Sequence, residues 1–396
     1  MVFVALKMLV GDRAKFLGIV FGITFAAMLI TQQASIFIGL MTRTFGFITD
    51  TTQPDVWVMD PKVQFVDDIK PMQDTQLLRV RGIEGVAWAM PLYKGLIQAR
   101  MDNGTFQNCN VIGIDDATLI GGPTEMVEGR LEDLRRSDSV IVDEVGARTR
   151  LAKPAPGAPR DAEGNIPPDW PRVPLTIGDT LELNDRRAVV VGICKVSRTF
   201  QSQPVLYTTY GRATQYAPRQ RKLLSFILVK AEDGLKPEEL TRRIREQTGL
   251  AAYTGWEFSE KTYMYFVRFT GIPINFGIAV ALGFLVGTAI AGQTFYNFTL
   301  DNLRQFGALK AMGASNRTLL GMILLQAAVV GVIGYGLGVG LASQFAQLSA
   351  RSELAFRLIW QTLAATGGAI VVISMLAASL SLLKVIRLEP AIVFKG

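Results

Sequence analysis

The sequence predicts a membrane protein with four transmembrane α-helices and one α+β domain outside the cytoplasm. Three observations lead to this prediction. Four long stretches contain no charged residue, and the whole chain is 49% hydrophobic and only 19% charged, against about 25% charged residues in soluble domains. Basic residues gather at the ends of these stretches. Between the first two stretches lies a long segment with strand and helix patterns of its own.

Each uncharged stretch exceeds the roughly 20 residues that cross the hydrocarbon core of a bilayer. Each must be helical, because lipid offers no partner for backbone polar groups. The predicted spans are residues 16–41, 271–300, 318–345 and 358–383. The first span follows basic residues, as in a signal peptide, but its apolar core is longer than the roughly 7–15 residues of a signal peptide. We therefore expect a retained helix.

The basic residues also predict orientation. With four spans, the N-terminal segment, the link at 301–317 and the tail at 384–396 lie on one side of the membrane. These segments carry Lys7, Arg13, Lys15, Arg304, Lys310, Arg317, Lys384, Arg387 and Lys395, so that side should be the cytoplasm. Arg351 and Arg357 in the third loop are a weak contrary signal. Segment 42–270 then lies outside the cytoplasm.

Segment 42–270 is large enough to form its own core. Its first part has a strand signal, a helix signal and two apolar runs, at 55–59, 75–81, 86–90 and 92–99. Its last part repeats this order, with a strand at 225–230, a helix at 236–248 and a strand at 251–258. Pro237 in the first turn and Gly249 just past the end delimit that helix. The pattern predicts two β-α-β units that flank a middle section.

A middle section at about 108–215 has strand signals and little helix, which predicts an inserted β-rich subdomain. The strand signals fall at 110–114, 140–142, 180–183 and 188–193. Within this section, residues 152–174 are rich in proline and polar residues. They predict a loop or hairpin extension, either a mobile linker or a loop that binds a partner.

Several kinds of chemistry lack their usual residues. The chain has no histidine and two cysteines, Cys109 and Cys194, which are either two buried thiols or a disulfide. It contains no Walker A pattern, no H-E-x-x-H, no G-x-S-x-G and no C-x-x-C. We therefore predict a non-catalytic chain without a cofactor or metal site. The net charge is +7. The basic residues cluster at the ends of the predicted spans, where membrane topology explains them, so nucleic acid is not an expected partner.

The spans themselves bear on mechanism. They contain no Asp, Glu, Lys or Arg, whereas ion-coupled transporters usually place such groups at the middle of the membrane. This absence argues against ion-coupled secondary transport.

The third span contains two glycine pairs at a spacing of four, Gly334 with Gly338 and Gly336 with Gly340. Such pairs let helix backbones approach closely, either within one subunit or between two copies.

The link at 301–317 mixes apolar and polar residues in a short helix-like segment. The apolar residues are Leu303, Phe306, Leu309 and Met312, and the polar ones include Arg304, Gln305 and Lys310. One interpretation is an interfacial helix that rests on lipid. The other is a surface helix whose exposed apolar residues dock in the groove of a partner protein.

This link resembles the cytoplasmic signature of FtsX-like permeases of the MacB and DevC type, roughly R-E-[FIY]-G-x-L-[KR]-A-[LIM]-G-A-[ST]. The matching residues are Arg304, Phe306, Gly307, Leu309, Lys310, Ala311, Met312, Gly313, Ala314 and Ser315. Gln305 departs from the family's usual Glu, which puts in doubt any ion pair made there. VEGR at 127–130, IGD at 177–179, VVVGI at 189–193 and the tail from Ile386 with Glu389, Pro390 and Ala391 also resemble the family in order.

The resemblance covers essentially the whole chain and implies an ABC transporter permease of a bacterial cell (inner) membrane that works by mechanotransmission. It also implies an outer domain made of a split porter-like α/β subdomain with an inserted β-rich subdomain, which agrees with the pattern of strands and helices. It implies a separate ABC ATPase that binds ATP and magnesium, a second permease copy, and a coupling helix at the link. It assigns the coupling role to Leu303, Arg304, Gln305, Phe306, Gly307, Leu309, Lys310, Met312, Gly313 and Ala314. Export with a periplasmic adaptor and an outer-membrane channel is the expected role. Regulation of an extracellular cell-wall hydrolase and lipoprotein extraction remain alternatives.

Overall fold

The computed structural model describes residues 2–101, 104–159, 166–167, 170–218, 223–349 and 354–386, without the side chains of Leu380 and of residues 382–386. The tail motif with Glu389, Pro390 and Ala391 and the loop residue Arg351 lie outside the described residues. The chain forms two compact units. One holds the residues up to Leu40 and those from Gly271 onward, and the other is Met41–Thr270.

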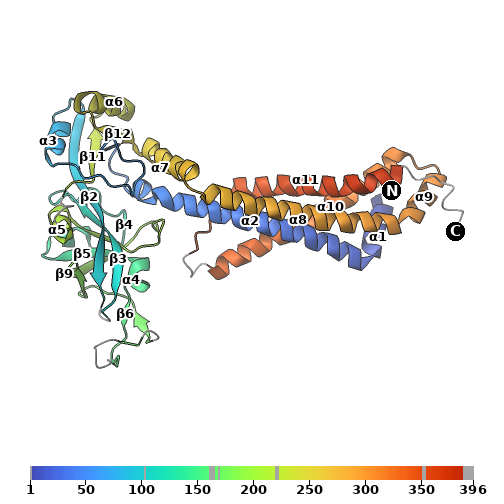
Figure 1. The fold of residues 1–396 in the computed structure, drawn as a ribbon, viewed down its shortest axis with the longest axis horizontal. Helices are drawn as coiled ribbons and strands as arrows, with labels where there is room; N and C mark the ends of the chain where they lie inside the picture. The colour runs from blue at the N-terminus through green and yellow to red at the C-terminus, as the bar shows by residue number, and fades with distance from the viewer. Residues whose placement is uncertain are drawn as a thin grey trace. The chain divides into compact units, whose positions relative to one another are not determined.

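The first unit is helical, and four of its helices are long and apolar enough to cross a membrane. Its helices are α1 (Val2–Gly11), α2 (Arg13–Asp50, up to Leu40), α8 (Ile272–Asp301), α9 (Leu303–Ala311), α10 (Asn316–Leu348) and α11 (Trp360–Ile386). Figure 1 shows α2, α8, α10 and α11 running alongside one another. Large apolar side chains stay exposed on all four, such as Phe21, Leu285, Leu337 and Met375. Such surfaces suit contact with lipid.

Helix α2 is longer than the sequence predicts. It continues from the expected end at residue 41 to Asp50, so its last turns belong to the second unit. Phe47 and Ile48 pack there against a sheet core, and the Phe47 ring meets Trp57 edge-on with centroids 5.7 Å apart. Hydropathy predicts only the apolar span of a helix, so the sequence analysis gave the span to residue 41 and not the nine further residues of the helix.

Glycines allow α2 to pack closely on α8. A Cβ atom on Gly287 would lie only 2.3 Å from the Cβ of Ala26. A Cβ atom on Gly22 would lie 2.7 Å from Cγ2 of Ile290. No side chain fits at such distances, so the absence of one at both positions sets the separation of the two helices.

The four glycines of the third predicted span divide into two kinds. A Cβ on Gly334 would lie 2.6 Å from Cγ2 of Ile23, and one on Gly338 would lie 2.5 Å from the Cβ of Ala27. Both therefore pack α10 onto α2 within the chain. Around Gly336 and Gly340 no described atom lies within 4 Å of such a Cβ, so this second pair faces open space.

The second unit is built on one ten-stranded sheet. Its main strand order is β12-β1-β11-β2-β3-β10-β5-β9-β4, with β8 pairing with β2 and β9. A separate ribbon is formed by β6 (Lys153–Pro154) and β7 (Arg172–Val173). The strands of the large sheet are β1 (Val56–Met59), β2 (Val86–Arg100), β3 (Phe106–Ile114), β4 (Glu125–Glu128), β5 (Ser139–Asp143), β8 (Thr180–Leu183), β9 (Arg186–Lys195), β10 (Val205–Thr209), β11 (Phe226–Ala231) and β12 (Ala251–Thr254).

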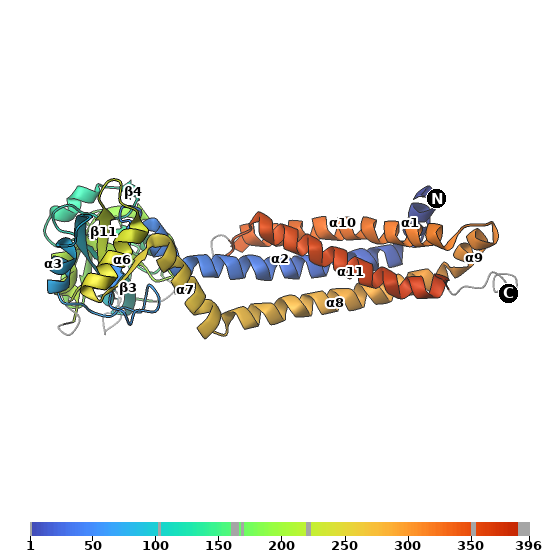
Figure 2. The same ribbon diagram turned by 90° about the horizontal axis from the view of Figure 1, so that it is seen from above.

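The two predicted β-α-β units interleave in this sheet. They are β1-α3-β2 and β11-α6-β12, where α3 is Thr75–Arg81 and α6 is Pro237–Thr248. Strand β1 lies between β11 and β12 and is antiparallel to both, as in a split βαβ fold. Leu240 and Ile244 of α6 are buried against the sheet, and Gly249 ends the helix at φ +72°. Figure 2 shows α3 and α6 among these strands.

Strand β2 joins the β-α-β part of the sheet to the inserted β-rich subdomain predicted at about 108–215. Its first part pairs with β11, from Val86 to Leu92. Its second part pairs with β3, from Tyr93 to Arg100. The two predicted apolar runs at 86–90 and 92–99 are thus one long strand, and the insertion extends the same sheet. The strand patterns do not predict this arrangement, because β11, the partner of the first half of β2, is distant in sequence, whereas β3 follows β2 directly. The insertion also holds short helices, namely η1 (Leu131–Arg135), α4 (Glu144–Arg148) and α5 (Tyr210–Tyr216).

The expected strand at 251–258 is wrong in its second half. Strand β12 ends at Thr254, and α7 (Gly255–Phe269) begins at once. Thr254 Oγ1 accepts a hydrogen bond from the Glu257 backbone N–H at 3.2 Å, and Glu257 Oε2 accepts from the Thr254 N–H at 2.9 Å. This capping box is a helix start signal that the sequence carries, and it outweighs the apolar residues that follow.

The two cysteines are free and buried. Cys109 belongs to one core cluster and Cys194 to another, so the interpretation as two thiols is confirmed and no disulfide joins them. Burial raises the pKa of both thiols, and the nearby charge of Asp143 raises it further. Because the thiolate is the reactive form, neither cysteine should react in the folded protein.

We predict that a water-soluble maleimide labels neither Cys109 nor Cys194 in the purified native protein and labels both after denaturation. Mass spectrometry of the protein before and after denaturation measures the number of adducts. Rapid labelling of either thiol in the native protein at neutral pH would contradict this burial.

We also predict that Gly338→Val destabilises the helical unit, whereas Gly340→Val, the same change two residues away, leaves it nearly unchanged. Overpacking at Gly338 should cost about 1–3 kcal/mol, because α2 would have to move. The midpoint of thermal unfolding in detergent, followed by size-exclusion chromatography, measures the difference. A larger loss for Gly340→Val than for Gly338→Val would show that the packing is wrong.

Candidate coupling segment

The predicted coupling residues 303–314 form α9 and the turn that follows it. Figures 1 and 2 show α9 and α1 at the same end of the helical unit. Asn302 separates α8 from α9 and keeps its side chain inside the joint, where Nδ2 donates to the Phe298 carbonyl at 2.8 Å. The chain therefore passes from a long apolar helix into α9 through a single residue.

The second half of the motif specifies how α9 ends. Gly313 has φ +95°, a conformation that other residues adopt with strain. The Gly313 N–H donates to the Lys310 carbonyl at 3.1 Å, and the Ala314 N–H donates to the Leu309 carbonyl at 3.0 Å. This is the Schellman pattern of helix termination, with Ala314 and Leu309 as its apolar contact; both pack on the same core.

Ser315, the last residue of the motif, begins the next helix. Its Oγ accepts from the Thr318 N–H at 3.3 Å, which caps α10. The run from Leu309 to Ser315 is thus explained locally, as a helix stop followed directly by a helix start. This local structure does not require a partner.

The apolar side of α9 faces the protein's own core, which corrects one expectation. Phe306 is 0% exposed and shares a cluster with Phe295, Phe298 and Leu319. Gly307 is also buried, and Leu303 and Leu309 pack partly against the same cluster. The expectation that Phe306 offers its ring to a partner is therefore wrong. A sequence shows that a helix has an apolar face but not which molecule covers it.

The exposed side of α9 is different in character. Met312 is 76% exposed, and Arg304, Ala308 and Gln305 are exposed as well. Arg304, Ala308 and Met312 are each four residues apart, so they follow one line along the helix. Lys310 and Ala314 are half-buried, and Gly313 is exposed. We call Arg304, Gln305, Ala308 and Met312 the open face of α9.

Helix α1 supports this end of the unit and was missed by the sequence analysis. Its Ala5 and Leu9 enter the same core as Phe306. Gln326 of α10 is buried, and its Nε2 donates to the Ala5 carbonyl at 2.8 Å. Lys15 forms ion pairs with Asp12, at 3.0 Å, and with Asp301 at the end of α8. The apolar run around Lys7 could have suggested a short interfacial helix.

Within the second unit, polar contacts fasten the last turns of α2 to the sheet. Asp50 accepts hydrogen bonds from the backbone N–H and the hydroxyl of Ser197, at 2.6 and 2.8 Å. Arg43 donates to Ser202 Oγ at 3.3 Å. Lys94 is only 3% exposed and pairs with Asp67, and its ammonium lies 5.6 Å from the Phe47 ring centroid. We call these contacts the α2 latch.

Among the described residues, no group of three or more His, Cys, Asp or Glu side chains is placed to hold a metal ion.

Comparisons with known proteins cover both units. Residues 16–247 match the family model of the MacB-like periplasmic core domain, and residues 277–390 match that of the FtsX-like permease C-terminal region. An uncharacterized ABC transporter permease of Mycobacterium tuberculosis is 26% identical over 334 residues, which is 82% of this chain and 80% of the relative. One of Mycobacterium bovis is 28% identical over 247 residues, covering 61% of this chain and 66% of the relative.

Among solved structures, the periplasmic region of MacB from Actinobacillus actinomycetemcomitans aligns with 54% of this chain and 94% of its own, at 17% identity and a TM-score of 0.37. The two family models together span both the outer unit and the later helices. This chain is therefore a member of the MacB/FtsX family of ABC transporter permeases.

Proposed function

We propose that the chain couples ATP hydrolysis by a separate ABC ATPase subunit to movement of its outer domain, for export. The observation that carries this proposal is the two-sided character of α9. One side is anchored in the helical core through Phe306, and the other leaves Arg304, Ala308 and Met312 exposed. ATP and magnesium would be bound by the partner subunit and not by this chain.

The anchoring of α9 supports a coupling role in a physical sense. A helix that merely rests on lipid would have its apolar side free, whereas this one is fixed by Asn302 at its start and Gly313 at its end. Force applied to its open face would pass into α8 and α10, because packed interiors transmit strain. The mixed apolar and basic open face suits the groove of a partner protein.

Helix α2 supports the second half of the proposal. It is unbroken from Arg13 to Asp50, so the same helix belongs to both units. The α2 latch connects its last turns to the rest of the second unit through charge-assisted hydrogen bonds, which are stronger than neutral ones. A displacement of α2 would then be transmitted to β2 through the contact of Phe47 with Lys94. It would be transmitted to the loop at Ser197 through the hydrogen bonds of Asp50.

We propose export as the direction in which the transporter moves its substrate. The exposed surfaces of the four long helices are apolar, and the spans carry no charged side chain for a polar pathway. A substrate acted on by the outer domain would not need to pass between these helices. We also propose a homodimer, a multi-pass location in a bacterial cell (inner) membrane, and an adaptor and outer-membrane channel as further partners.

We predict that a cysteine at Asn316 is cytoplasmic and that one at Asp233 is outside. Both positions are exposed, and the two native cysteines are buried, so neither should add background. In spheroplasts, a membrane-impermeant maleimide should label Asp233→Cys and spare Asn316→Cys until the cells are lysed. Labelling of Asn316→Cys with protection of Asp233→Cys would reverse the topology.

We predict that Met312→Asp weakens binding of the ATPase about ten- to hundredfold. Burying one such side chain is worth about 1.5–3 kcal/mol, and each 1.4 kcal/mol is about tenfold in affinity. Arg304→Ala should cost less, about 0–1 kcal/mol, as for an exposed ion pair. Co-purification and permease-dependent ATPase activity in lipid nanodiscs measure both effects, and native mass spectrometry of the same sample should show two permeases in each complex.

Asn316→Asp is the matched control, because it adds the same charge at an exposed position outside α9. Phe306→Asp should instead reduce the amount of folded protein, because it buries a charge in the core. Full binding and full ATPase control in Met312→Asp would refute coupling through this face. A single permease in the complex would refute the homodimer.

A further inference from the structure

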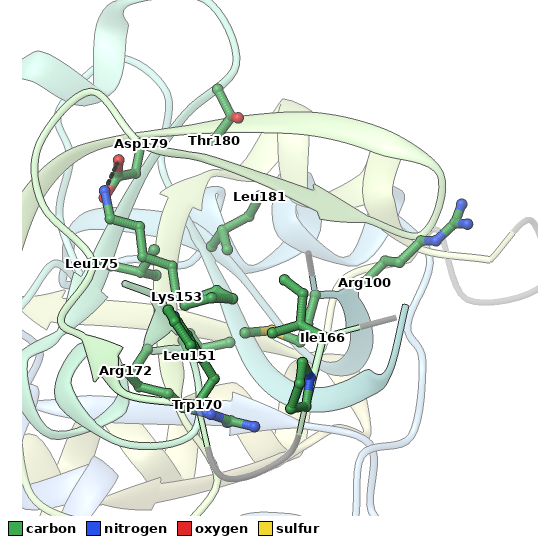
Figure 3. Close-up of a pocket in the computed structure, with 14 residues that line it drawn as sticks. Arg100, Leu151, Lys153, Ile166, Trp170, Arg172, Leu175, Asp179, Thr180 and Leu181 are labelled. Atoms are coloured by element: carbon green, nitrogen blue, oxygen red, sulfur yellow. Dashed lines mark hydrogen bonds and ion pairs between the residues drawn. The ribbon is translucent and has the colours of Figure 1, made fainter. Parts of the chain in front are cut away.

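A hollow lies at the base of the β6–β7 ribbon in the outer unit. Its volume is about 120 Å³, and it is bordered by β6, β7, the start of β8 and the end of β2. Figure 3 shows the residues around it, with Lys153 and Asp179 at one end and Arg100 at the other. Part of its lining comes from described residues of the proline-rich stretch at 152–174, of which residues 160–165 and 168–169 lie outside the described residues. For this stretch the sequence left a linker and a partner-binding loop as alternatives.

The floor of the hollow is apolar and rigid. Leu151, Leu175 and Leu181 line it, and all three are buried members of the core cluster that also holds Cys109. Trp170 contributes a wall, and its Nε1 donates to the Ala155 carbonyl at 3.1 Å, which ties the indole to the ribbon. The floor therefore belongs to the folded core of the domain and is not formed by a loose loop.

The lining is basic on balance. Three basic side chains, Arg100, Lys153 and Arg172, and one acidic one, Asp179, belong to it. Lys153 is paired with Asp179 at 2.6 Å. Arg100 has only a long contact with Glu182, at 3.8 Å. Among the described residues, no carboxylate pairs with Arg172. Within the described part of the chain, the positive charges of the Arg100 and Arg172 guanidinium groups near the hollow are thus neutralised weakly or not at all by carboxylates.

The volume limits the occupant. Pockets that hold a drug-sized molecule are about 300–1,000 Å³, so this hollow is too small for one. A cavity of about 150 Å³ lined by apolar side chains takes up benzene, which is the size of one large side chain. Folded proteins leave few such voids, and an apolar floor is a poor site for water. One large apolar side chain of another molecule is therefore the occupant whose size and polarity fit.

We propose that this hollow is a docking site for a segment of a partner protein in which one large apolar side chain is flanked by acidic residues. The apolar side chain enters between Trp170 and the leucine floor. The acidic neighbours meet Arg172 and Arg100, whose charges have no other strong partner among the described residues. A free small molecule would use only the central cavity and leave the separated guanidinium groups without a ligand. The site is independent of the α9 proposal, because it uses only residues of the outer unit.

The test uses the full-length permease in nanodiscs and three fluorescein-labelled peptides. The probe is Glu-Asp-Phe-Glu-Asp-amide with fluorescein on its N-terminal amine, and the control peptides carry the label at the same place. In one control peptide Lys replaces every acidic residue, and in the other Ala replaces Phe. Fluorescence anisotropy measures binding, with unlabelled 4-phenylbutyrate as a small-molecule competitor. The probe should bind at least about tenfold more tightly than either control peptide, and 4-phenylbutyrate should compete only at far higher concentration than the unlabelled probe.

Variants distinguish binding in the hollow from nonspecific attraction of the acidic probe to basic residues elsewhere on the surface. Arg172→Glu and Trp170→Ala should each weaken the probe at least about tenfold, whereas Arg186→Glu, an exposed charge reversal outside the hollow, should not. Thermal unfolding checks that each variant is folded. The proposal is overturned if the probe fails to bind, if Arg172→Glu and Arg186→Glu act alike, or if 4-phenylbutyrate binds as tightly as the probe, which would make this a small-molecule site.

Discussion

Close packing of α2 on its two neighbours is the constraint on which the helical unit depends. Gly22 and Gly287 set its distance from α8, and Gly334 and Gly338 set its distance from α10. In lipid, apolar side chains gain little by leaving one apolar surface for another, so helices associate mainly through close van der Waals contact. Glycine supplies that contact by removing side chains where backbones meet. The same helix then enters the outer unit and is held there by the α2 latch, so its placement affects both units.

Much of the fold could be predicted from the sequence because its signals are local. Uncharged stretches revealed the four long helices, and Pro237 with Gly249 delimited α6. The sequence was less informative where the deciding contact was distant. Only the pairing of β2 with β11, more than 100 residues away, shows that the insertion extends the same sheet. The last turns of α2 were missed because a sheet core covers them and lipid does not.

The coupling segment shows the same division between local and distant information. Its motif was recognised from the sequence, and its Gly313 and Ser315 now have a local explanation as a helix stop and a helix cap. The direction of Phe306 could not be predicted, because an apolar side chain is equally consistent with a partner's groove and with the chain's own core. Met312 was singled out for the same apolar character and has the opposite environment. The two side chains are both apolar and differ in burial: Phe306 is buried in the core, and Met312 is exposed.

The hydrogen bond from Gln326 to the Ala5 carbonyl has a consequence for how the protein is made. Its two residues are 321 positions apart, and a ribosome adds about 5–20 residues each second. The first helix is therefore synthesised roughly 15 s to 1 min before the helix that receives it. During that interval, Ala5 and Leu9 lack their α10 neighbours. The contact between α1 and α10 can therefore form only after α2, the whole second unit and α8 have been synthesised.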